Sequence, residues 1–385
     1  MSGTGEAGSP PLVLHVIPTA VARGAQREAR ALATVLDVPG ARHHRLLSLF
    51  AGPSGVPVDV DLAHPARGQA GVGFDVRLAR RLRAELRRLD PAVLVAHGGD
   101  PLKYLVAATL GARRPLAYYA TGTFEHAARP ARVRAWRALV RRADVVACEG
   151  SEVLDEVRRL LRVPAARSLL APNGRDPAEF HPPDGPHPEP PTVAFVGAFT
   201  TGKRPDRFVA VVDALRRRGM PVRAVACGDG PLKASLEERA AAAGVRLLGS
   251  RADVAEVLRG ADLFVFPSRP TGEGMPGVLI EAGLTGLAVV ASAVPGVSSV
   301  VEDGVTGFVV DAEDAEAMVD ATARLVADPG LRRRMGAAAR QRCAAQFSLD
   351  AVAACWTAFL SPLVAGAVSA RAGRSGPGNP RAPGA

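Results

Sequence analysis

Short apolar runs alternate with longer amphipathic stretches along the first half of this 385-residue chain. Short apolar runs bounded by turn residues are typical of buried strands, and apolar residues at every third or fourth position are typical of helices. The pattern predicts strands at 12–17, 92–96, 116–119, 144–148 and 168–171, and helices at 25–36, 74–89, 101–110, 131–142 and 151–161. Strands that alternate with helices predict a parallel, doubly wound sheet.

The same alternation restarts after residues 181–191, which hold six prolines in eleven positions. Such a stretch excludes a helix or a central strand and predicts a semi-rigid linker. Beyond it the pattern predicts strands at 193–196, 222–226, 245–248, 263–266, 288–291 and 308–310, a helix at 206–217, and final helices at 314–327, 330–346 and 349–359. We therefore predict an α/β protein with two Rossmann-like domains, at 1–180 and 192–346. The Gly- and Pro-rich end of the chain, 363–385, is expected to be disordered.

Positive charge is concentrated in the first half of the chain. The net charge is +10, and residues 1–172 hold 25 basic against 15 acidic residues, whereas 173–365 hold 20 against 23. This asymmetry predicts contact with a polyanion, an acidic acceptor or an anionic membrane, although an Arg-rich genome gives much of the same bias. The basic helix at 131–142, with Trp136, either lies on anionic lipid or presents a solvated face with its Trp in the core. Nucleic acid is not expected as a partner, because only 4% of residues are aromatic and no recognition motif is visible.

The segments that direct proteins to membranes are not visible in the sequence. The N-terminus has neither the basic start nor the apolar core of a signal peptide, and no apolar run reaches the roughly 18 residues of a membrane span. The four cysteines, Cys148, Cys227, Cys343 and Cys355, form no C-x-x-C pair and have no His at metal-ligand spacing. We expect reduced thiols, no metal site and a cytoplasmic location.

The segment R-P-T-G-E-G-M-P-G-V-L-I-E holds two carboxylates, Glu273 and Glu281, eight positions apart. We predict Pro276 as the first residue of a helix, because its fixed φ suits a helix start and its missing N–H is not needed there. The free N–H groups of Gly277 and Val278 would then hold an anion such as a diphosphate, with the carboxylates accepting hydrogen bonds from hydroxyls on either side. A capped surface helix with one loop Glu and one solvated Glu explains the same spacing.

Two features of the first half have the form of ligand-binding positions. The strand at 12–17 continues through a loop containing Gly24 into a helix, an arrangement that presents backbone N–H groups to a ligand at the carboxyl end of a sheet. His97 ends a later strand in the segment V-A-H-G-G-D, where it is either a site residue or a hydrogen-bonded strand-end histidine.

Several ordered motifs resemble those of GT-B glycosyltransferases, specifically the large retaining family, family 4, that uses nucleotide-sugar donors. The E-x7-E motif of that family is similar to E-G-M-P-G-V-L-I-E at 273–281, and its continuation is similar to A-V-P-G-V-S-S-V-V-E-D-G-V-T-G-F-V-V at 293–310. Further similar segments are A-P-N-G-R-D-P-A-E-F at 171–180, C-G-D-G-P-L at 227–232, G-S-R-A-D-V at 249–254 and A-D-L-F-V-F-P-S at 261–268. The resemblance spans residues 10 to about 362. It implies two domains facing each other across a cleft, with the last helix, 347–362, crossing back onto the first.

The resemblance also implies a function and a set of site residues. The expected reaction moves a hexosyl group from a UDP- or GDP-linked donor to an unidentified acceptor (a small molecule, lipid or glycan), with retention and without a metal or cofactor. Expected catalytic residues are Glu273, which would bind the sugar hydroxyls, Lys203, which would neutralise the diphosphate, and His97, near the anomeric centre. Expected donor-binding residues are Glu281, which would bind the ribose, together with Gly24, Gly197, Arg204, Gly274, Met275, Pro276, Gly277 and Val278.

Two positions depart from the family pattern. The Arg that the family has five residues before the lysine is Ala198 here, with Arg204 nearby to compensate. The first-domain Gly-Gly of the family is Arg23-Gly24. No D-x-D motif stands where a divalent cation would be needed. A catalytically silent GT-B protein that binds a nucleotide or a partner is the alternative function.

Overall fold

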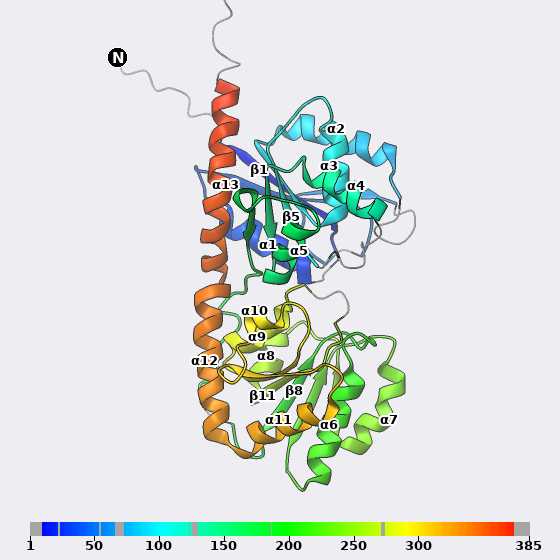
Figure 1. Ribbon diagram of the computed structural model, residues 1–385, viewed down its shortest axis with the longest axis vertical. Coiled ribbons are helices and arrows are strands. Elements are labelled where there is room, and N and C mark those ends of the chain that lie inside the picture. Colours follow the sequence, from blue (N-terminus) through cyan, green and yellow to red (C-terminus); the bar gives the residue numbers. More distant parts are fainter. Residues whose placement is uncertain are drawn as a thin grey trace, which may run out of the picture.

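The computed structural model describes residues 10–21, 24–53, 55–65, 73–122, 124, 130–185, 187–270 and 274–372. Two parallel sheets, each packed between helices, lie one above the other, joined along one side by the last two helices (Figure 1). This arrangement confirms the predicted α/β fold class with two Rossmann-like domains. Residues 181–185 and 187–191 of the proline-rich stretch contain neither helix nor strand.

The first sheet has the strand order β3-β2-β1-β4-β5-β6-β7, and its neighbouring strands are parallel. The strands are β1 (Leu12–Thr19), β2 (His43–Phe50), β3 (Val60–His64), β4 (Val93–His97), β5 (Leu116–Ala120), β6 (Val145–Cys148) and β7 (Ser168–Leu170). The helices are α1 (Gly24–Leu36), α2 (Val76–Leu89), α3 (Gly99–Ala108), α4 (Pro130–Val140) and α5 (Ser151–Arg159). The sequence pattern missed β2 and β3, because polar residues open β2 and alternate along the edge strand β3.

The second sheet has the order β10-β9-β8-β11-β12-β13 and is also parallel. Its strands are β8 (Thr192–Val196), β9 (Arg223–Cys227), β10 (Val245–Gly249), β11 (Leu263–Phe266), β12 (Ala288–Ser292) and β13 (Gly307–Val310). Its helices are α6 (Pro205–Arg217), α7 (Lys233–Ala243), α8 (Val254–Arg259), α9 (Gly277–Leu284), α10 (Val297–Val300) and α11 (Ala315–Ala327). The six predicted strands of this domain all form.

Two long helices, α12 (Pro329–Phe347) and α13 (Leu349–Ala372), run along one side of both domains (Figure 1). α13 lies against α1 and β4 of the first domain, where Trp356 is 1% exposed. The helix continues through Ala372, so the expectation of a disordered tail from residue 363 is wrong for 363–372; residues 373–385 lie outside the described residues. Burial of Val364 and Ala367 on the first domain stabilises this extension despite its small, Gly-containing sequence.

α13 also corrects an expectation about membrane spans. Among the described residues it is the one helix long and apolar enough to cross a membrane, although only a third of its most apolar window (33%) is buried. The search for uninterrupted apolar runs missed it, because scattered polar residues divide the helix. Its buried side chains, among them Trp356 and Leu360, belong to the core of the first domain.

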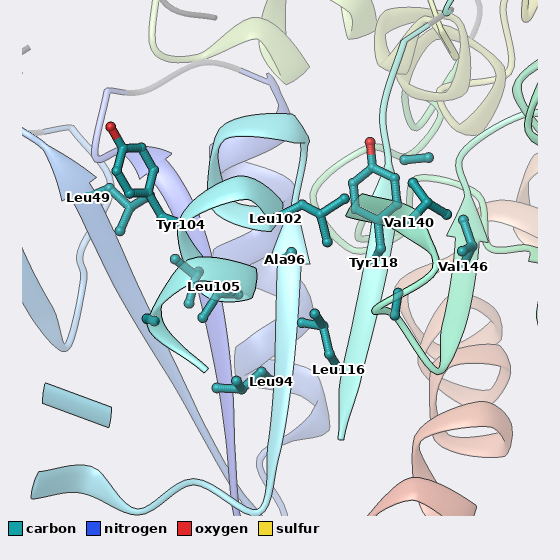
Figure 2. Close-up of a cluster of buried hydrophobic side chains, with 14 of the residues drawn as sticks. Leu49, Leu94, Ala96, Leu102, Tyr104, Leu105, Leu116, Tyr118, Val140 and Val146 are labelled. Atoms are coloured by element: carbon teal, nitrogen blue, oxygen red, sulfur yellow. The ribbon is translucent and has the colours of Figure 1, made fainter. Parts of the chain in front are cut away.

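The central strands β4 and β5 of the first sheet are buried on both faces. On one face Ala96 of β4 packs with Leu102 and Leu105 of α3, as Figure 2 shows. On the other face Val95 packs with Trp356 of α13. Burial on both faces explains why these strands are continuous apolar runs. A ligand therefore has access to these strands at their ends and not at their faces.

Candidate active site between the two domains

Each sheet has a switch point, where the connections leave two adjacent central strands in opposite directions and open a crevice at their carboxyl ends. The switch points lie between β1 and β4 in the first sheet and between β8 and β11 in the second. Gly24 begins α1 after β1, and His97 ends β4. Lys203 follows β8, and α9 follows β11. The positions predicted from local motifs therefore coincide with the binding edges of both sheets.

Helix α9 begins one residue later than predicted. Pro276 has φ −70° and ψ 101°, an extended conformation, so it is the N-cap and Gly277 is the first helical residue. The expectation was wrong because a ψ of this value takes proline out of the helical region, which its fixed φ alone does not prevent. Among the described residues no side-chain hydrogen bond caps this end, so the N–H groups of Gly277 and Val278 are candidates for binding an anion. Glu273, like Arg23, lies outside the described residues.

Contacts with the first domain hold the loop before α9. Asn173 Nδ2 donates a hydrogen bond to the carbonyl of Met275 at 3.3 Å. A Cβ on Gly274 would lie 1.5 Å from Glu149 Oε1 and 2.8 Å from the backbone nitrogen of Gly122. The two domains therefore approach each other directly at Gly274, where only a glycine leaves the necessary space.

Three charged side chains form a cluster that we call the ionic junction. They are Glu28 of α1, Arg175 of the segment after β7, and Glu281 of α9. Arg175 Nε donates to Glu281 Oε1 at 2.7 Å, and its Nη1 donates to Glu28. Glu28 also accepts from the backbone nitrogen of Gly174 at 2.6 Å. Burial opposes the charge of Arg175, yet Glu281 and Glu28 together raise its pKa. Burial raises the pKa of Glu28, and Arg175 opposes that rise.

The ionic junction lines a cavity of about 430 Å³, to which Gly24 and Arg27 also contribute. Gly24 and Glu281, predicted as donor-binding residues in different domains, thus border the same space. A Cβ on Gly277 would lie 2.1 Å from Arg175 Nη2, so the guanidinium also lies against the start of α9. Arg175 is therefore placed to position Glu281 and to influence any anion bound at this helix end.

The loop after β8 lies beside the loop after β11. The backbone nitrogen of Arg269 donates to the carbonyl of Gly202 at 2.8 Å. Lys203 Nζ lies 5.4 Å from the ring centroid of Phe266, the last residue of β11. A Cβ on Gly197 would lie 3.9 Å from Lys203 Cβ, so Gly197 belongs to the same loop surface. These contacts place the lysine at the strand edge from which α9 also starts.

Arg204, predicted to compensate for Ala198, makes contacts within its own domain. It is 9% exposed, and its Nη1 donates to the carbonyl of Ala312 at 3.1 Å. The same guanidinium lies 3.5 Å from a carboxylate oxygen of Glu313. These bonds tie the start of α6 to the connection between β13 and α11. A role of Arg204 in donor binding stays a prediction, and Ala198 is exposed.

Three imidazoles on adjacent strands form a hydrogen-bonded row that we call the histidine stack: His44 of β2, His15 of β1 and His97 of β4. His15 Nδ1 lies 2.9 Å from His97 Nε2, and His15 Nε2 lies 2.9 Å from His44 Nδ1. The indole of Trp356 stacks over His97 with an interplanar angle of 11°. Burial lowers the pKa of His97 to about 3 and, with a further contribution from Arg42, that of His44 to about 4. Burial also lowers the pKa of His15 well below its usual range, so the stack is uncharged near neutral pH.

His97 lines a smaller cavity of about 240 Å³ at the first switch point. Gln26, Asp100 and Thr121 line the same cavity, and Gln26 Oε1 is buried without a hydrogen-bond partner. These side chains are suited to hydroxyl groups, since each offers a hydrogen-bond acceptor or donor. The cavity is below the roughly 300–1,000 Å³ of drug-sized ligand pockets, so it suits a single ring.

Sequence reasoning placed the candidate residues at strand ends and in the loops after strands, but it missed the strand order and the partners of these residues. His15 carried a usable signal, because a polar residue in the middle of an apolar strand requires a buried partner. Its partner His44 lies on a strand that was not predicted. Arg175 and Glu28 carried no such signal: they are 147 positions apart, and only the fold brings them together.

Comparisons with known proteins agree with this architecture. Residues 22–179 match the family model described as Glycosyltransferase Family 4, and residues 177–342 match the one described as Glycosyl transferases group 1. The chain is 31% identical over 302 residues to alpha-D-kanosaminyltransferase of Streptomyces kanamyceticus, covering 72% of this chain and 78% of that protein. It is 32% identical over 291 residues to alpha-maltose-1-phosphate synthase of Mycolicibacterium smegmatis, covering 67% and 69%.

Solved structures show the same fold at lower sequence identity. The crystal structure of Anabaena HepE in complex with UDP and glucose superposes with a TM-score of 0.74 at 18% identity, covering 91% of this chain and 99% of that chain. Sucrose-phosphate synthase from Thermosynechococcus elongatus superposes with a TM-score of 0.74 at 20% identity, covering 92% and 100%. At these identities the likeness establishes the two-domain fold.

Proposed function

The chain belongs to the family 4 glycosyltransferases, and from this premise we propose that it moves a hexosyl group from a UDP- or GDP-linked donor to an acceptor, with retention of configuration and without a bound metal ion. The observation that carries the proposal is the pair of switch points on either side of the domain junction. The switch point of the second domain offers Lys203, Glu281 and the start of α9. The switch point of the first domain offers His97 and Gly24. Such a site matches a donor with hydroxyl-bearing groups on both sides of a diphosphate.

The reaction requires stabilisation of charge on the departing phosphate. Fixed hydrogen-bond donors and cations aimed at that charge supply the main catalytic effect in such a transfer. In our proposal these are Lys203 and the N–H groups of Gly277 and Val278, which make a metal ion unnecessary. The paired carboxylates of a retaining glycosidase are not required by this route, and we assign no nucleophile.

Nucleotide binding tests the donor half of the proposal. We expect UDP or GDP to raise the melting temperature and ADP to leave it unchanged, because only a bound ligand stabilises the folded state by mass action. Lys203→Ala and Glu281→Gln should each abolish the shift, whereas the control Lys233→Ala, on the exposed pair with Asp229, should retain it. A shift that survives both site variants would overturn the assignment.

Donor turnover tests the chemical half. The enzyme should release free nucleotide from its donor in the absence of acceptor, at a rate that EDTA does not change and that Lys203→Ala lowers at least tenfold. Nuclear magnetic resonance of the transferred sugar should show the anomeric configuration of the donor. A catalytically silent binder, the alternative that the named relatives disfavour, would release no nucleotide.

We also propose a cytoplasmic location with peripheral contact to an anionic membrane. Helices α2 and α4 lie on either side of α3 on one face of the first domain (Figure 1). Their exposed arginines are Arg77, Arg80, Arg81, Arg87, Arg88, Arg132 and Arg134. Phe74 and Val76, at the start of α2, are 50% and 52% exposed. Arginines beside exposed apolar side chains are typical of helices that bind lipid surfaces.

The aromatic anchor of this contact differs from the one considered from sequence. Trp136 of α4 packs on Tyr118 and Phe124 in the core, as the solvated-face interpretation predicted. We therefore assign the apolar contact to Phe74. In a sedimentation experiment the enzyme should pellet with vesicles that contain 30% phosphatidylglycerol and not with vesicles of pure phosphatidylcholine. The double variant Arg80→Glu/Arg81→Glu should stay in the supernatant with both. Equal binding to both vesicles would contradict the proposal.

A further inference from the structure

The histidine stack has only one end that a ligand reaches. His97 Nε2 is used by His15, so its Nδ1 is the nitrogen available at the cavity that His97 lines, and no described residue bonds to it. At the other end His44 Nε2 is buried without a partner. Trp356 lies beside His15 as well as over His97, which keeps the row away from solvent.

The number of protons in this row restricts its hydrogen-bond pattern. Three neutral imidazoles carry three N–H groups, and two of them fill the two bonds at 2.9 Å. The third N–H must lie at one end, on His97 Nδ1 or on His44 Nε2. Because each imidazole has one donor and one acceptor, fixing one end fixes the tautomer of all three rings.

The surroundings of the two ends decide between these patterns. An N–H on His44 Nε2 would be a buried donor without a partner, which is rarer in proteins than a buried acceptor in the same situation. The charges near His44 do not decide the pattern, because Arg42 and Asp37 act on this ring in opposite directions. An N–H on His97 Nδ1 can instead bond to a water or a ligand hydroxyl in the cavity.

We propose that His44 and His15 are positioning residues that hold His97 as its Nδ1–H tautomer, so that His97 donates a hydrogen bond into the cavity. The chain of donors runs from His44 Nδ1 to His15 Nε2, from His15 Nδ1 to His97 Nε2, and from His97 Nδ1 to the ligand. This inference rests on the proposed function for the identity of the ligand, a sugar or acceptor oxygen. It assigns His97 the role of a hydrogen-bond donor and excludes it as the base that deprotonates the acceptor.

Tautomers can be read directly, without donor or acceptor. In the full-length enzyme labelled with ¹⁵N-histidine, long-range ¹H–¹⁵N correlation spectra at pH 7.5 distinguish a protonated Nδ1 from a protonated Nε2. We expect His97, assigned by its loss in His97→Asn, to carry the proton on Nδ1. Protonation of His97 on Nε2 in the wild-type protein would overturn the proposal. The nucleotide shifts and turnover described above test the proposed function separately.

Two substitutions at His44 separate positioning from packing. His44→Leu removes the donor that fixes His15, so the His97 signal should change to the Nε2–H form or to a mixture. His44→Asn places an amide N–H close to the position of Nδ1, so the Nδ1–H form of His97 should persist. An unchanged His97 spectrum in His44→Leu would overturn the positioning role. Loss of the Nδ1–H form in a folded His44→Asn protein would do the same.

Discussion

The ionic junction lines one cavity and the histidine stack reaches another through His97, yet the two clusters use opposite electrostatics. The junction holds three formal charges, the buried Glu28 and the partly buried Arg175 and Glu281, and pairs both carboxylates with the guanidinium. The stack buries three ionisable groups as neutral rings, because burial lowers the pKa of each and outweighs the opposing effect of Asp37 on the pKa of His44. A buried group keeps its charge only where the fold supplies a partner.

The comparison also changes the meaning of the net charge. The first half of the chain is strongly basic, but most of its exposed arginines on helices lie on the outer helices α2 and α4, and the cavities take from it the uncharged His97 beside the charged Arg27, Glu28 and Asp100. The second half is close to neutral overall, yet it contributes Arg175 and Glu281 to the ionic junction. Net charge therefore predicts the partners of an outer surface and not the chemistry of the site.

Acid should affect the protein most, through the stack. The folded-state pKa of each ring lies below the unfolded value, so these rings contribute stability that is present above about pH 6.5 and lost as pH falls toward 4. Between pH 6.5 and 5 the loss is about 1.5 kcal/mol per imidazole, or roughly 5 kcal/mol for three rings that stay neutral in the folded state. Urea unfolding at both pH values measures it. His44→Leu should reduce the difference by about a third, and an undiminished difference would contradict a neutral stack.

Arg175→Ala should have the next largest effect, through the ionic junction. Removing the cation leaves the buried Glu28 and the partly buried Glu281 uncompensated, which costs about 3 kcal/mol or more of unfolding free energy. Urea unfolding at pH 7.5 checks this value. The control Arg113→Ala, which breaks a pair whose arginine side chain is 75% exposed, should cost at most about 1 kcal/mol. Equal losses in the two variants would show that Arg175 is not the centre of a buried network.

Gly274→Ala tests the close approach of the two domains at this glycine. We expect it to lower the unfolding free energy less than Arg175→Ala does. The new Cβ would overlap Glu149 and the backbone of Gly122, so the domains should separate rather than unfold. We expect a larger radius of gyration in small-angle X-ray scattering and a higher KM for the donor, with little change in melting temperature. An unchanged radius with an unchanged KM would argue against a requirement for this contact.

Gly24→Ala should have the smallest effect and is the matched control for Gly274→Ala. A Cβ at Gly24 meets no atom within 4 Å, so the unfolding free energy should stay within about 0.5 kcal/mol of wild type. If donor turnover nevertheless falls, the need for glycine comes from a ligand in the cavity. A loss of unfolding free energy above about 1 kcal/mol would show that Gly24 packs against other atoms in the folded protein.

Much of this protein follows from its sequence because the signals are local. Apolar runs and turn residues predict the central strands of both sheets, the proline-rich stretch separates them, and the glycosyltransferase motifs mark both switch points. Propensity and periodicity act over neighbouring residues, so they need no knowledge of the fold. The local rules fail where tertiary contacts override them, as in the edge strand β3 and in the last ten residues of α13.

The tertiary structure alone decided how the site residues work together. His15 meets His97 across 82 positions, and Arg175 meets Glu281 across 106. Whether an imidazole is neutral or a carboxylate is paired depends on burial and on neighbours distant in sequence, which no local pattern encodes. The sequence determined which candidate residues follow the ends of the central strands. Folding determined that Arg175 joins Glu28 of one domain to Glu281 of the other, and that His97 ends a row of neutral rings.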